Sequence, residues 1–538
     1  RGRLYLTPSL AAAVTPALAY LAGYPYGCSE QTMSRFLPSV LARQAGNFAQ
    51  LPEELTQNLD DFVAAGLKRL YDFQHDDGGW GFWQHDDSSL YISSYVLTGL
   101  LQAQEAGYRV RPEVLERGVA YLLKTLNRPD AHTYAADAVA YAAYAFALAG
   151  PAYMPRERSS SGATFARTPS TRQPYLTRTA YQQTPPLDFS YLQDYLKRPD
   201  LTPYGHALIV LTYHHNGNRT LAEQALEGLL ARLTERERTA YWEVRAPRGA
   251  WNDDRIEATA RGLEALAKLR PNHPAVPKVV NWLMQERRGA RWVSTKDTAA
   301  VVIAALALAK ATGEQPSEQE VQVRVNGQAQ TLKVPARGAE LALEGLRVGE
   351  NEVQVISNNR LYTSGSVSYF EEKEYLRPES RGLRVARTYQ RLTPRYDASA
   401  ERFVYEPSPL TGPVKAGELV LVTLSVRPEQ DALRYVVVEE PTPAGLVVVE
   451  KDDSFRIAGV RSRFGDDYYG WNYWFDGREI RDRQVEFFFS YLSGPITFTY
   501  VLRAETPGRF TALPTLAWMM YEPEVRGVGT VQTLQVRE

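Results

Sequence analysis

The chain has 538 residues, and its 61 Lys and Arg against 62 Asp and Glu give a formal net charge of −1. A hydrophobic content of 44% with 23% charged residues is typical of folded proteins and excludes wholesale disorder. The balanced charge argues against a general nucleic-acid binder, and no apolar run reaches the roughly 20 residues that a membrane-spanning helix needs. One Cys and seven His exclude an internal disulfide framework and a Cys-rich zinc site.

Helices are predicted up to about residue 315, because apolar residues recur there three and four positions apart, as at Leu221, Ala225 and Leu229. Pro and Gly occupy the gaps between the apolar segments. The predicted helices span residues 60–73, 91–106, 112–126, 134–149, 204–215, 221–233, 256–269 and 298–311. Many carry apolar or small residues on more than one face, so we expect an array of helical hairpins that pack on both sides.

Weak similarities between segments of the helical region favour a repeat. A turn of Gly and Trp, followed by a polar cap and an apolar helix, occurs at residues 78–80, 249–251 and 289–292. Repeats of this kind can close into an α/α toroid, and the alternative is an irregular helical domain. Residues 156–186 break the pattern, because they are rich in Ser, Thr, Arg, Gln and Pro, and they are predicted to form a mobile surface insertion.

Strands are predicted after residue 315. Val321, Val323 and Val325 alternate with polar residues and lead into Asn326 and Gly327, which is a strong hairpin signal. Further strands are predicted at residues 353–356, 364–369, 383–389, 418–426, 435–438, 447–449, 486–491, 497–503 and 510–513, with another hairpin at Asp476 and Gly477. We therefore expect a multidomain chain with an all-α toroid at residues 1–314, a β segment at 315–377 and a β-sandwich at 378–538.

The chain's one Cys lies in a segment that is suited to covalent chemistry. Cys28 and Gln31 are three positions apart after Gly27, and residues at that spacing share one face of a helix. If the Cys28 sulfur attacks the Gln31 side-chain carbonyl and ammonia leaves, an internal thioester forms, which is an activated acyl group. Such a bond needs cover from water, and Tyr24 and Tyr26 are placed to provide it. The alternative is a small buried Cys beside an unrelated Gln.

The run at residues 23–38, GYPYGCSEQTMSRFLP, resembles the thioester motif of the alpha-2-macroglobulin and complement superfamily, and most of all that of its bacterial members. Residues 8–20 and 292–298 resemble other parts of the family's thioester domain, and residues 440–445 and 519–527 resemble its last β domain. The presence of a single Cys favours a resemblance to the bacterial branch, because animal members are rich in disulfides. The resemblance implies a thioester domain, the returning part of a CUB-like domain and a macroglobulin-like sandwich, in that order.

The resemblance also implies a function, that of a broad-range endopeptidase inhibitor with a single-use reactive bond rather than an enzyme. A protease cuts a bait segment, the molecule rearranges, and a Lys amine of the protease attacks the Gln31 carbonyl while Cys28 leaves as a thiolate. Met520 and Tyr521 would cover the thioester in such a protein. The family further implies macroglobulin-like domains and a bait upstream, a monomer, a periplasmic or cell-envelope site with a lipid anchor, and neither a cofactor nor a metal.

Three alternatives stay open. Residues 74–80, QHDDGGW, resemble a repeat of terpenoid cyclases, but the Asp-x-Asp-Asp cluster that protonating cyclases need is not found. A Cys protease needs a His base near the thiol, and the sequence offers no local signature for one. The third alternative is a non-covalent binding module in which the thioester is hydrolysed or never formed.

The His residues and paired Asp residues give weaker signals. His132 is the nearest candidate to assist acyl transfer, but its surroundings favour a surface position at a helix start. The pair His214 and His215, and the pair His75 and His85, lack the constellation of a metal site. The Asp pairs at 76–77 and 253–254 are predicted to be turn and cap residues rather than metal ligands.

Overall fold

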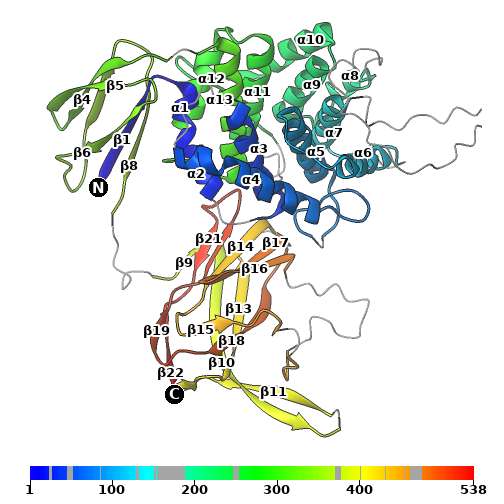
Figure 1. Ribbon diagram of the computed structural model, residues 1–538, viewed down its shortest axis with the longest axis vertical. Coiled ribbons are helices and arrows are strands. Elements are labelled where there is room, and N and C mark those ends of the chain that lie inside the picture. Colours follow the sequence, from blue (N-terminus) through cyan, green and yellow to red (C-terminus); the bar gives the residue numbers. More distant parts are fainter. Residues whose placement is uncertain are drawn as a thin grey trace, which may run out of the picture. The chain divides into compact units, whose positions relative to one another are not determined.

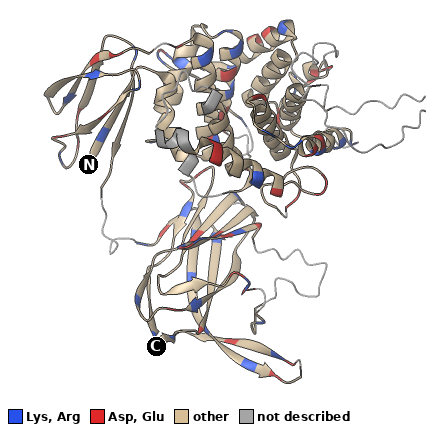
Figure 2. Ribbon diagram, viewed as in Figure 1, with Lys and Arg blue, Asp and Glu red and all other residues tan. Residues whose placement is uncertain are grey.

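The structure of the chain is a computed structural model that describes residues 1–23, 27–44, 53–84, 86–128, 133–150, 153, 188–245, 254–314, 316–369, 377–399, 401–429, 432–452, 455–460 and 475–538. It divides into two compact units, Arg1–Tyr369 and Phe370–Glu538 (Figure 1). In both units, basic and acidic residues are interspersed along the helices and strands (Figure 2). Among the described helices, none is both long and apolar enough to cross a membrane.

Helices make up most of the first unit. They are α1 (Leu10–Ala13), α2 (Thr15–Gly23), α3 (Ser29–Gln44), α4 (Glu53–Asp72), α5 (Leu90–Glu105), α6 (Pro112–Leu126), α7 (Ala136–Ala149), α8 (Leu192–Tyr195), α9 (Pro203–His215), α10 (Arg219–Leu230), α11 (Arg255–Leu269), α12 (Ala275–Gln285) and α13 (Thr295–Thr312). The predicted helices are confirmed, except that the one expected at 221–233 ends at Leu230 and gives way to β2.

The longer helices close into a ring. Helices α3, α5, α7, α9, α11 and α13 contact one another in that order, and α13 meets α3 to complete the circle. Helix α4 packs outside α3, α6 outside α5 and α7, α10 outside α9 and α11, and α12 outside α11. The inner helices begin at one rim of the ring, here called the N-terminal rim, where the starts of neighbouring helices contact each other: Thr295 of α13 contacts Glu30 of α3, and the backbone N–H of Thr202, before α9, donates to Asp137 of α7. The expected α/α toroid is confirmed.

A Trp residue joins each of three outer helices to the inner helix that follows. The indole N–H groups of Trp80, Trp242 and Trp292 donate to backbone carbonyls near the ends of α4, α10 and α12, at 2.7, 2.8 and 2.6 Å. The backbone N–H of each Trp donates to a hydroxyl of the next inner helix, on Ser93, Thr259 and Thr298 respectively. The expected copy of the repeat at 249–251 lies outside the described residues, and Trp242 takes the equivalent place.

The first unit also contains strands, which are β1 (Gly2–Thr7), β2 (Leu233–Glu235), β3 (Ala240–Trp242), β4 (Gln319–Val325), β5 (Gln328–Val334), β6 (Ala339–Leu343), β7 (Val353–Ser357) and β8 (Tyr362–Val367). The predicted turn at Asn326 and Gly327 is confirmed, because both have positive φ and join the paired strands β4 and β5. Sequence reasoning placed residues 1–7 with the helices, but β1 lies between β6 and β8, and Leu4 and Leu6 join the core of these sheets.

The second unit is a β-sandwich, as predicted. Its strands are β9 (Glu379–Arg381), β10 (Leu383–Asp397), β11 (Arg402–Pro409), β12 (Val414–Lys415), β13 (Leu419–Pro428), β14 (Leu433–Pro441), β15 (Leu446–Val448), β16 (Gly477–Ile480), β17 (Gln484–Leu492), β18 (Ile496–Ala504), β19 (Gly508–Ala512), β20 (Leu516–Met519), β21 (Arg526–Val528) and β22 (Gln532–Arg537). The two large sheets have the orders β11-β10-β13-β18-β15 and β16-β17-β14-β20-β21-β9, and a smaller third sheet has the order β12-β22-β19.

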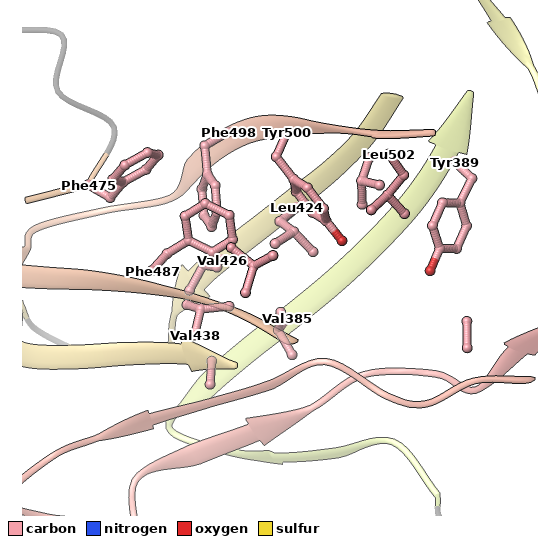
Figure 3. Packing of buried hydrophobic residues seen from close by; sticks show 14 of the residues in the cluster. Val385, Tyr389, Leu424, Val426, Val438, Phe475, Phe487, Phe498, Tyr500 and Leu502 are labelled. Carbon is pink, nitrogen blue, oxygen red and sulfur yellow. The ribbon is translucent and has the colours of Figure 1, made fainter. Parts of the chain in front are cut away.

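Aromatic and β-branched side chains from both sheets form the sandwich core. Phe487 of one sheet packs against Phe498 of the other with ring centroids 4.7 Å apart (Figure 3). The hairpin predicted at Asp476 and Gly477 is wrong in position: Gly477 begins β16, and the turn to β17 follows Ile480. The Asp-Gly pair therefore stands at the beginning of β16, and the register of β16 is set by its pairing with β17. The insertion at 156–186 lies outside the described residues.

Candidate functional site

Cys28 and Gln31 face each other across the start of α3. The backbone N–H of Gln31 donates to the Cys28 sulfur at 3.4 Å, and the backbone N–H of Cys28 donates to Gln31 Oε1 at 3.2 Å. The Cys28 carbonyl accepts the first intrahelical bond, from Thr32 at 2.8 Å, so Cys28 holds the N-cap position. This reciprocal pattern is a capping box in which sulfur replaces the usual hydroxyl oxygen and Gln supplies the third helical residue.

The capping box explains the spacing of the two residues in physical terms. It holds each side chain within 3.4 Å of the other residue's backbone nitrogen, and both residues are buried, Cys28 at 0% and Gln31 at 2% exposure. The N-terminus of a helix favours negative charge because its amide groups and dipole point there. A sulfur at this position is therefore suited to attack the carbonyl and to depart again as an anion.

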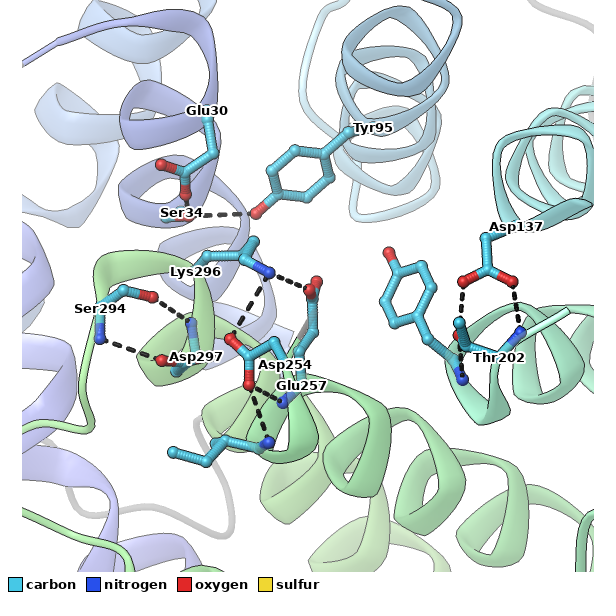
Figure 4. Close-up of polar contacts among 12 residues, drawn as sticks. Glu30, Ser34, Tyr95, Asp137, Thr202, Asp254, Glu257, Ser294, Lys296 and Asp297 are labelled. Carbon is cyan, nitrogen blue, oxygen red and sulfur yellow. Dashed lines mark hydrogen bonds and ion pairs between the residues drawn. The ribbon is translucent and has the colours of Figure 1, made fainter. Parts of the chain in front are cut away.

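Glu30 connects the first turn of α3 to a neighbouring inner helix. Its fully buried carboxylate accepts a hydrogen bond from Ser34 on the next turn and lies 3.4 Å from the hydroxyl of Thr295 on α13. The Ser34 hydroxyl in turn is 3.2 Å from the Tyr95 hydroxyl of α5 (Figure 4). Glu30, one of the two residues between the partners of the capping box, is thus connected to the two neighbouring inner helices, directly to α13 and through Ser34 to α5.

The segment that enters α3 is held from outside the ring. Arg69 of α4 donates through Nε to the Gly27 carbonyl at 2.7 Å. The backbone N–H of Ser29 donates to the carbonyl of Phe82 at 2.8 Å, which ties the motif to the loop that precedes α5. These contacts join residues that are far apart in the sequence, and nothing local in the sequence marks Arg69 or Phe82 as part of the site.

Buried charges lie at the same rim of the ring, at the starts of α11 and α13. The Lys296 ammonium pairs with Glu257 at 2.6 Å and with Asp254 at 3.5 Å (Figure 4). Burial raises the pKa of Glu257 above its usual range, even with Lys296 beside it. Although burial alone would lower it, the pKa of Lys296 lies above its usual value because Glu257 and Asp254 favour the charged form. The ammonium is therefore held protonated.

The residues expected to shield the thioester fall in two places. Tyr24 and Tyr26 lie outside the described residues. Met520 and Tyr521 belong to the second unit, where the buried Met520 donates its backbone N–H to the carbonyl of Tyr435 at 2.8 Å. The ring of Tyr521 lies edge-on to that of Tyr435 at 5.2 Å. The predicted shielding therefore stays a prediction.

Several weaker signals have structural explanations. His75 contacts the Ser88 hydroxyl and the Trp83 carbonyl, each at 2.9 Å, within the loop before α5. Asp77 accepts from the backbone N–H of Gly79, and Asp254 caps α11, as the predicted turn and cap roles require. His85, His132 and Asp253 lie outside the described residues. Within the described part of the chain, no group of three or more His, Cys, Asp and Glu could hold a metal ion.

Comparisons with known proteins point to one family in both units. The family model for the A-macroglobulin TED domain matches residues 5–132, and the model for the bacterial alpha-2-macroglobulin MG10 domain matches residues 382–524. The alpha-2-macroglobulin of Escherichia coli is 24% identical over 99% of this chain and 30% of its own length. That of Thermotoga maritima is 29% identical over 56% of this chain and 15% of its own length. The chain spans less than a third of either relative.

Solved structures share the fold over the whole chain. Native E. coli alpha-2-macroglobulin, spanning domain MG7 to the C-terminus, gives a TM-score of 0.68 at 21% identity, over 100% of this chain and 77% of that one. Salmonella alpha-2-macroglobulin reacted with methylamine gives a TM-score of 0.70 at 20% identity, over 100% of this chain and 32% of that one. At these identities the structural likeness bears on the fold alone.

Proposed function

Because the chain belongs to the bacterial alpha-2-macroglobulin family and corresponds to its C-terminal portion, we propose that it carries an internal thioester between Cys28 and Gln31 and forms part of a protease inhibitor. The observation that carries the proposal is the capping box, in which each residue's backbone N–H bonds the other's side chain at 3.2–3.4 Å. That arrangement holds both side chains at the first turn of α3, where both are buried.

The thioester forms by a balanced exchange within the motif. The Cys28 sulfur attacks the side-chain carbon of Gln31, the new S–C bond forms, and the C–N bond of the carboxamide breaks. The thiol proton leaves with the nitrogen as ammonia. The product is an acyl group whose leaving group is a thiolate at a helix N-terminus, where negative charge is favoured.

Capture of a protease is the second step. A Lys amine of the protease attacks the same carbon, an isopeptide bond forms, the C–S bond breaks, and the amine proton passes to the sulfur or to water. In the longer inhibitor, cleavage of a bait segment precedes this step and exposes the bond. The reaction consumes the site, so the protein is an inhibitor with one use rather than a catalyst. Support comes from the Salmonella relative, whose crystal structure is that of the protein reacted with the small amine methylamine.

The test is intact mass with thiol titration, before and after methylamine. We expect a mass short of the sequence mass by one ammonia and no free thiol. Methylamine should then add to Gln31 and release one thiol. Cys28→Ser and Gln31→Glu are matched controls, because Ser at the N-cap and Glu at the third helical position keep the capping box while removing the thiol or the carboxamide. Both variants should fold and neither should react.

The other outcomes favour the non-covalent alternative. A full sequence mass with a free Cys28 from the start would contradict the thioester. A mass raised by conversion of Gln31 to Glu, again with a free thiol, would mean that the bond forms and hydrolyses. Capture is tested by incubating the chain with a Lys-rich protein before and after reductive methylation of its amines. A covalent adduct should form only with the unmethylated protein.

A further inference from the structure

One peptide group, that between Gly27 and Cys28, is hydrogen-bonded at both ends within the site. Its N–H, which belongs to Cys28, donates to Gln31 Oε1 at 3.2 Å. Its carbonyl, which belongs to Gly27, accepts from Arg69 Nε at 2.7 Å and from the Thr32 hydroxyl at 3.5 Å. The Arg69 guanidinium, this peptide group and the reacting carbonyl of Gln31 therefore form one chain of hydrogen bonds.

Arg69 is fitted closely to this position. It lies near the end of α4, and its guanidinium carbon is 4.8 Å from the centre of the ring of Phe73, the residue directly after that helix. The guanidinium also fills the space beside Gly27, because a Cβ added at residue 27 would lie 2.6 Å from the guanidinium carbon of Arg69. The absence of a side chain at Gly27 is thus what allows a cation to reach the backbone of the motif.

Two general effects strengthen the Cys28 N–H as a donor. A hydrogen bond from an ionised donor is stronger than one between neutral groups. Bonds in a chain polarise one another, so electron density drawn toward the Gly27 oxygen makes the N–H of the same peptide group more acidic. That N–H points to Gln31 Oε1, which is the atom that becomes negative when a nucleophile adds to the adjacent carbon. A fixed donor at such an atom lowers the barrier to addition.

We infer that the backbone N–H of Cys28 is the oxyanion donor of the thioester reaction, and that Arg69 is a positioning residue that orients and polarises it. The inference rests on the proposed thioester. The donor acts in both steps. When the Cys28 sulfur adds to Gln31, the oxyanion collapses and ammonia leaves. When an amine adds to the thioester, the oxyanion collapses and the thiolate leaves.

A purely structural role for Arg69 predicts the opposite kinetic effect. If Arg69 only seals the motif, its loss should expose the bond, and methylamine should then react faster. If Arg69 polarises the oxyanion donor, its loss should slow methylamine, because the tetrahedral intermediate is less stabilised. The sign of the rate change therefore separates the two roles without reference to the size of the effect.

The experiment compares Arg69→Gln, Arg69→Lys and Lys68→Gln by the rate of methylamine-dependent thiol release, with melting temperature as a check on folding. We expect Arg69→Gln to react at least about tenfold more slowly, since removal of a whole oxyanion donor costs about 100-fold or more and here the donor is only weakened. Arg69→Lys should recover part of the rate, because Lys keeps the charge but not the planar fork. Lys68→Gln, on the exposed side of the same helix, should match the wild type.

A variant that forms no thioester at all is also informative. If Arg69→Gln shows a free Cys28 and an intact Gln31 while the wild type is crosslinked, the first step has been lost, as the inference predicts. If Arg69→Gln fails to fold, Gly27→Ala replaces it, because the added Cβ displaces the guanidinium and leaves its charge in the protein. Gly27→Ala should then be slow as well.

The inference is overturned if Arg69→Gln, or Gly27→Ala in its place, folds, forms the thioester and reacts as fast as the wild type or faster. A wild-type chain without a thioester contradicts the proposed function itself, and that result appears before any substitution is made. The two failures are therefore distinguishable.

Discussion

A helix N-cap can satisfy free amide groups with oxygen or with sulfur, and only the sulfur is also a good nucleophile. The same reciprocal box occurs at the start of α13, where Ser294 and Asp297 bond each other's backbone N–H groups at 3.1 and 3.0 Å. At that position neither side chain is a thiol or a carboxamide, so the proposed exchange has no counterpart there. The difference between the two boxes is the identity of two side chains, which places the chemistry of the site at the scale of single residues.

The first prediction separates capping from reactivity. Relative to wild-type protein whose proposed thioester has been opened with methylamine, Cys28→Ser should change the free energy of unfolding by no more than about 0.5 kcal/mol, because a hydroxyl caps at least as well as a thiol. Cys28→Ala should lower it by about 0.5–2 kcal/mol through loss of the cap. Urea unfolding measures both. Equal losses for the two variants would show that the Cys28 side chain does not cap α3.

The second prediction concerns the buried His206 of α9. Burial lowers the pKa of His206 to about 4. The unfolded chain binds a proton at this residue near pH 6.5 and the folded one does not, so this contribution is complete above pH 6.5 and is lost as the pH falls toward 4, on the order of 2–3 kcal/mol. His206→Gln does not titrate and keeps a donor for the Ala225 carbonyl, which His206 Nε2 contacts at 2.8 Å. Its melting temperature should fall less than that of the wild type between pH 6.5 and 4.5, and parallel curves would contradict the assignment.

Sequence reasoning at this scale finds what is local and misses what is not. Cys28 and Gln31 were visible because three positions separate them, and the capping rule alone could have paired them. Arg69 lies 42 positions from Gly27, and its role depends on how α4 packs against α3, which no short motif encodes. Glu30 is in the motif, but its partner Thr295 lies 265 positions away.

At the scale of elements, a buried ion pair joins neighbouring inner helices. Lys296 of α13 pairs with Glu257 of α11 with both side chains at least 96% buried. Lys296→Met should lower the free energy of unfolding by about 3–5 kcal/mol, because an uncompensated carboxylate is left inside the ring. Burial raises the pKa of Glu257 in the folded protein, and in this variant the carboxylate also lacks its cation. The loss of stability should therefore shrink as the pH falls and the carboxylate is protonated.

The double variant Glu257→Gln with Lys296→Met is the control for this pair. It removes both charges and should recover much of the lost stability, with a weaker dependence on pH. Thermal unfolding of the three proteins at pH 7 and pH 5 measures the effect. A single variant as stable as the wild type at pH 7 would mean that Glu257 finds another partner.

The Trp repeat provides the fourth prediction. Trp80→Phe, Trp242→Phe and Trp292→Phe each remove an indole N–H from a buried backbone carbonyl and should each cost about 1–3 kcal/mol in urea unfolding. Three similar losses are expected because the three contacts are equivalent. The sequence pattern of Gly beside Trp marks Trp80 and Trp292, but not Trp242, whose contact to the Leu229 carbonyl joins residues 13 positions apart.

At the scale of the whole molecule, the change of period near residue 315 reveals helices followed by strands, because the two patterns are properties of local sequence. The place of β1 between β6 and β8 is set by pairing across more than 300 positions, and it escapes such reasoning. The second unit buries its own core, with residues of both sheets in one cluster. Residues 377–538 expressed alone should therefore unfold cooperatively on heating, as followed by circular dichroism, and a broad non-cooperative melt would contradict this independence.

The inner helices start on one side of the domain, and several of those starts carry polar caps, among them Ser89, Thr202, Asp254 and Ser294. The scaffold thus supplies a helix N-terminus at each of these starts, but the start of α3 alone combines a thiol, a carboxamide and the Arg69 contact to the Gly27 carbonyl. Ser294→Cys with Asp297→Gln would supply the two side chains at the start of α13, but it would also remove a buried carboxylate that faces Asp254 and Lys296. An electrophile at a second helix start therefore needs matching neighbours as well as the two side chains.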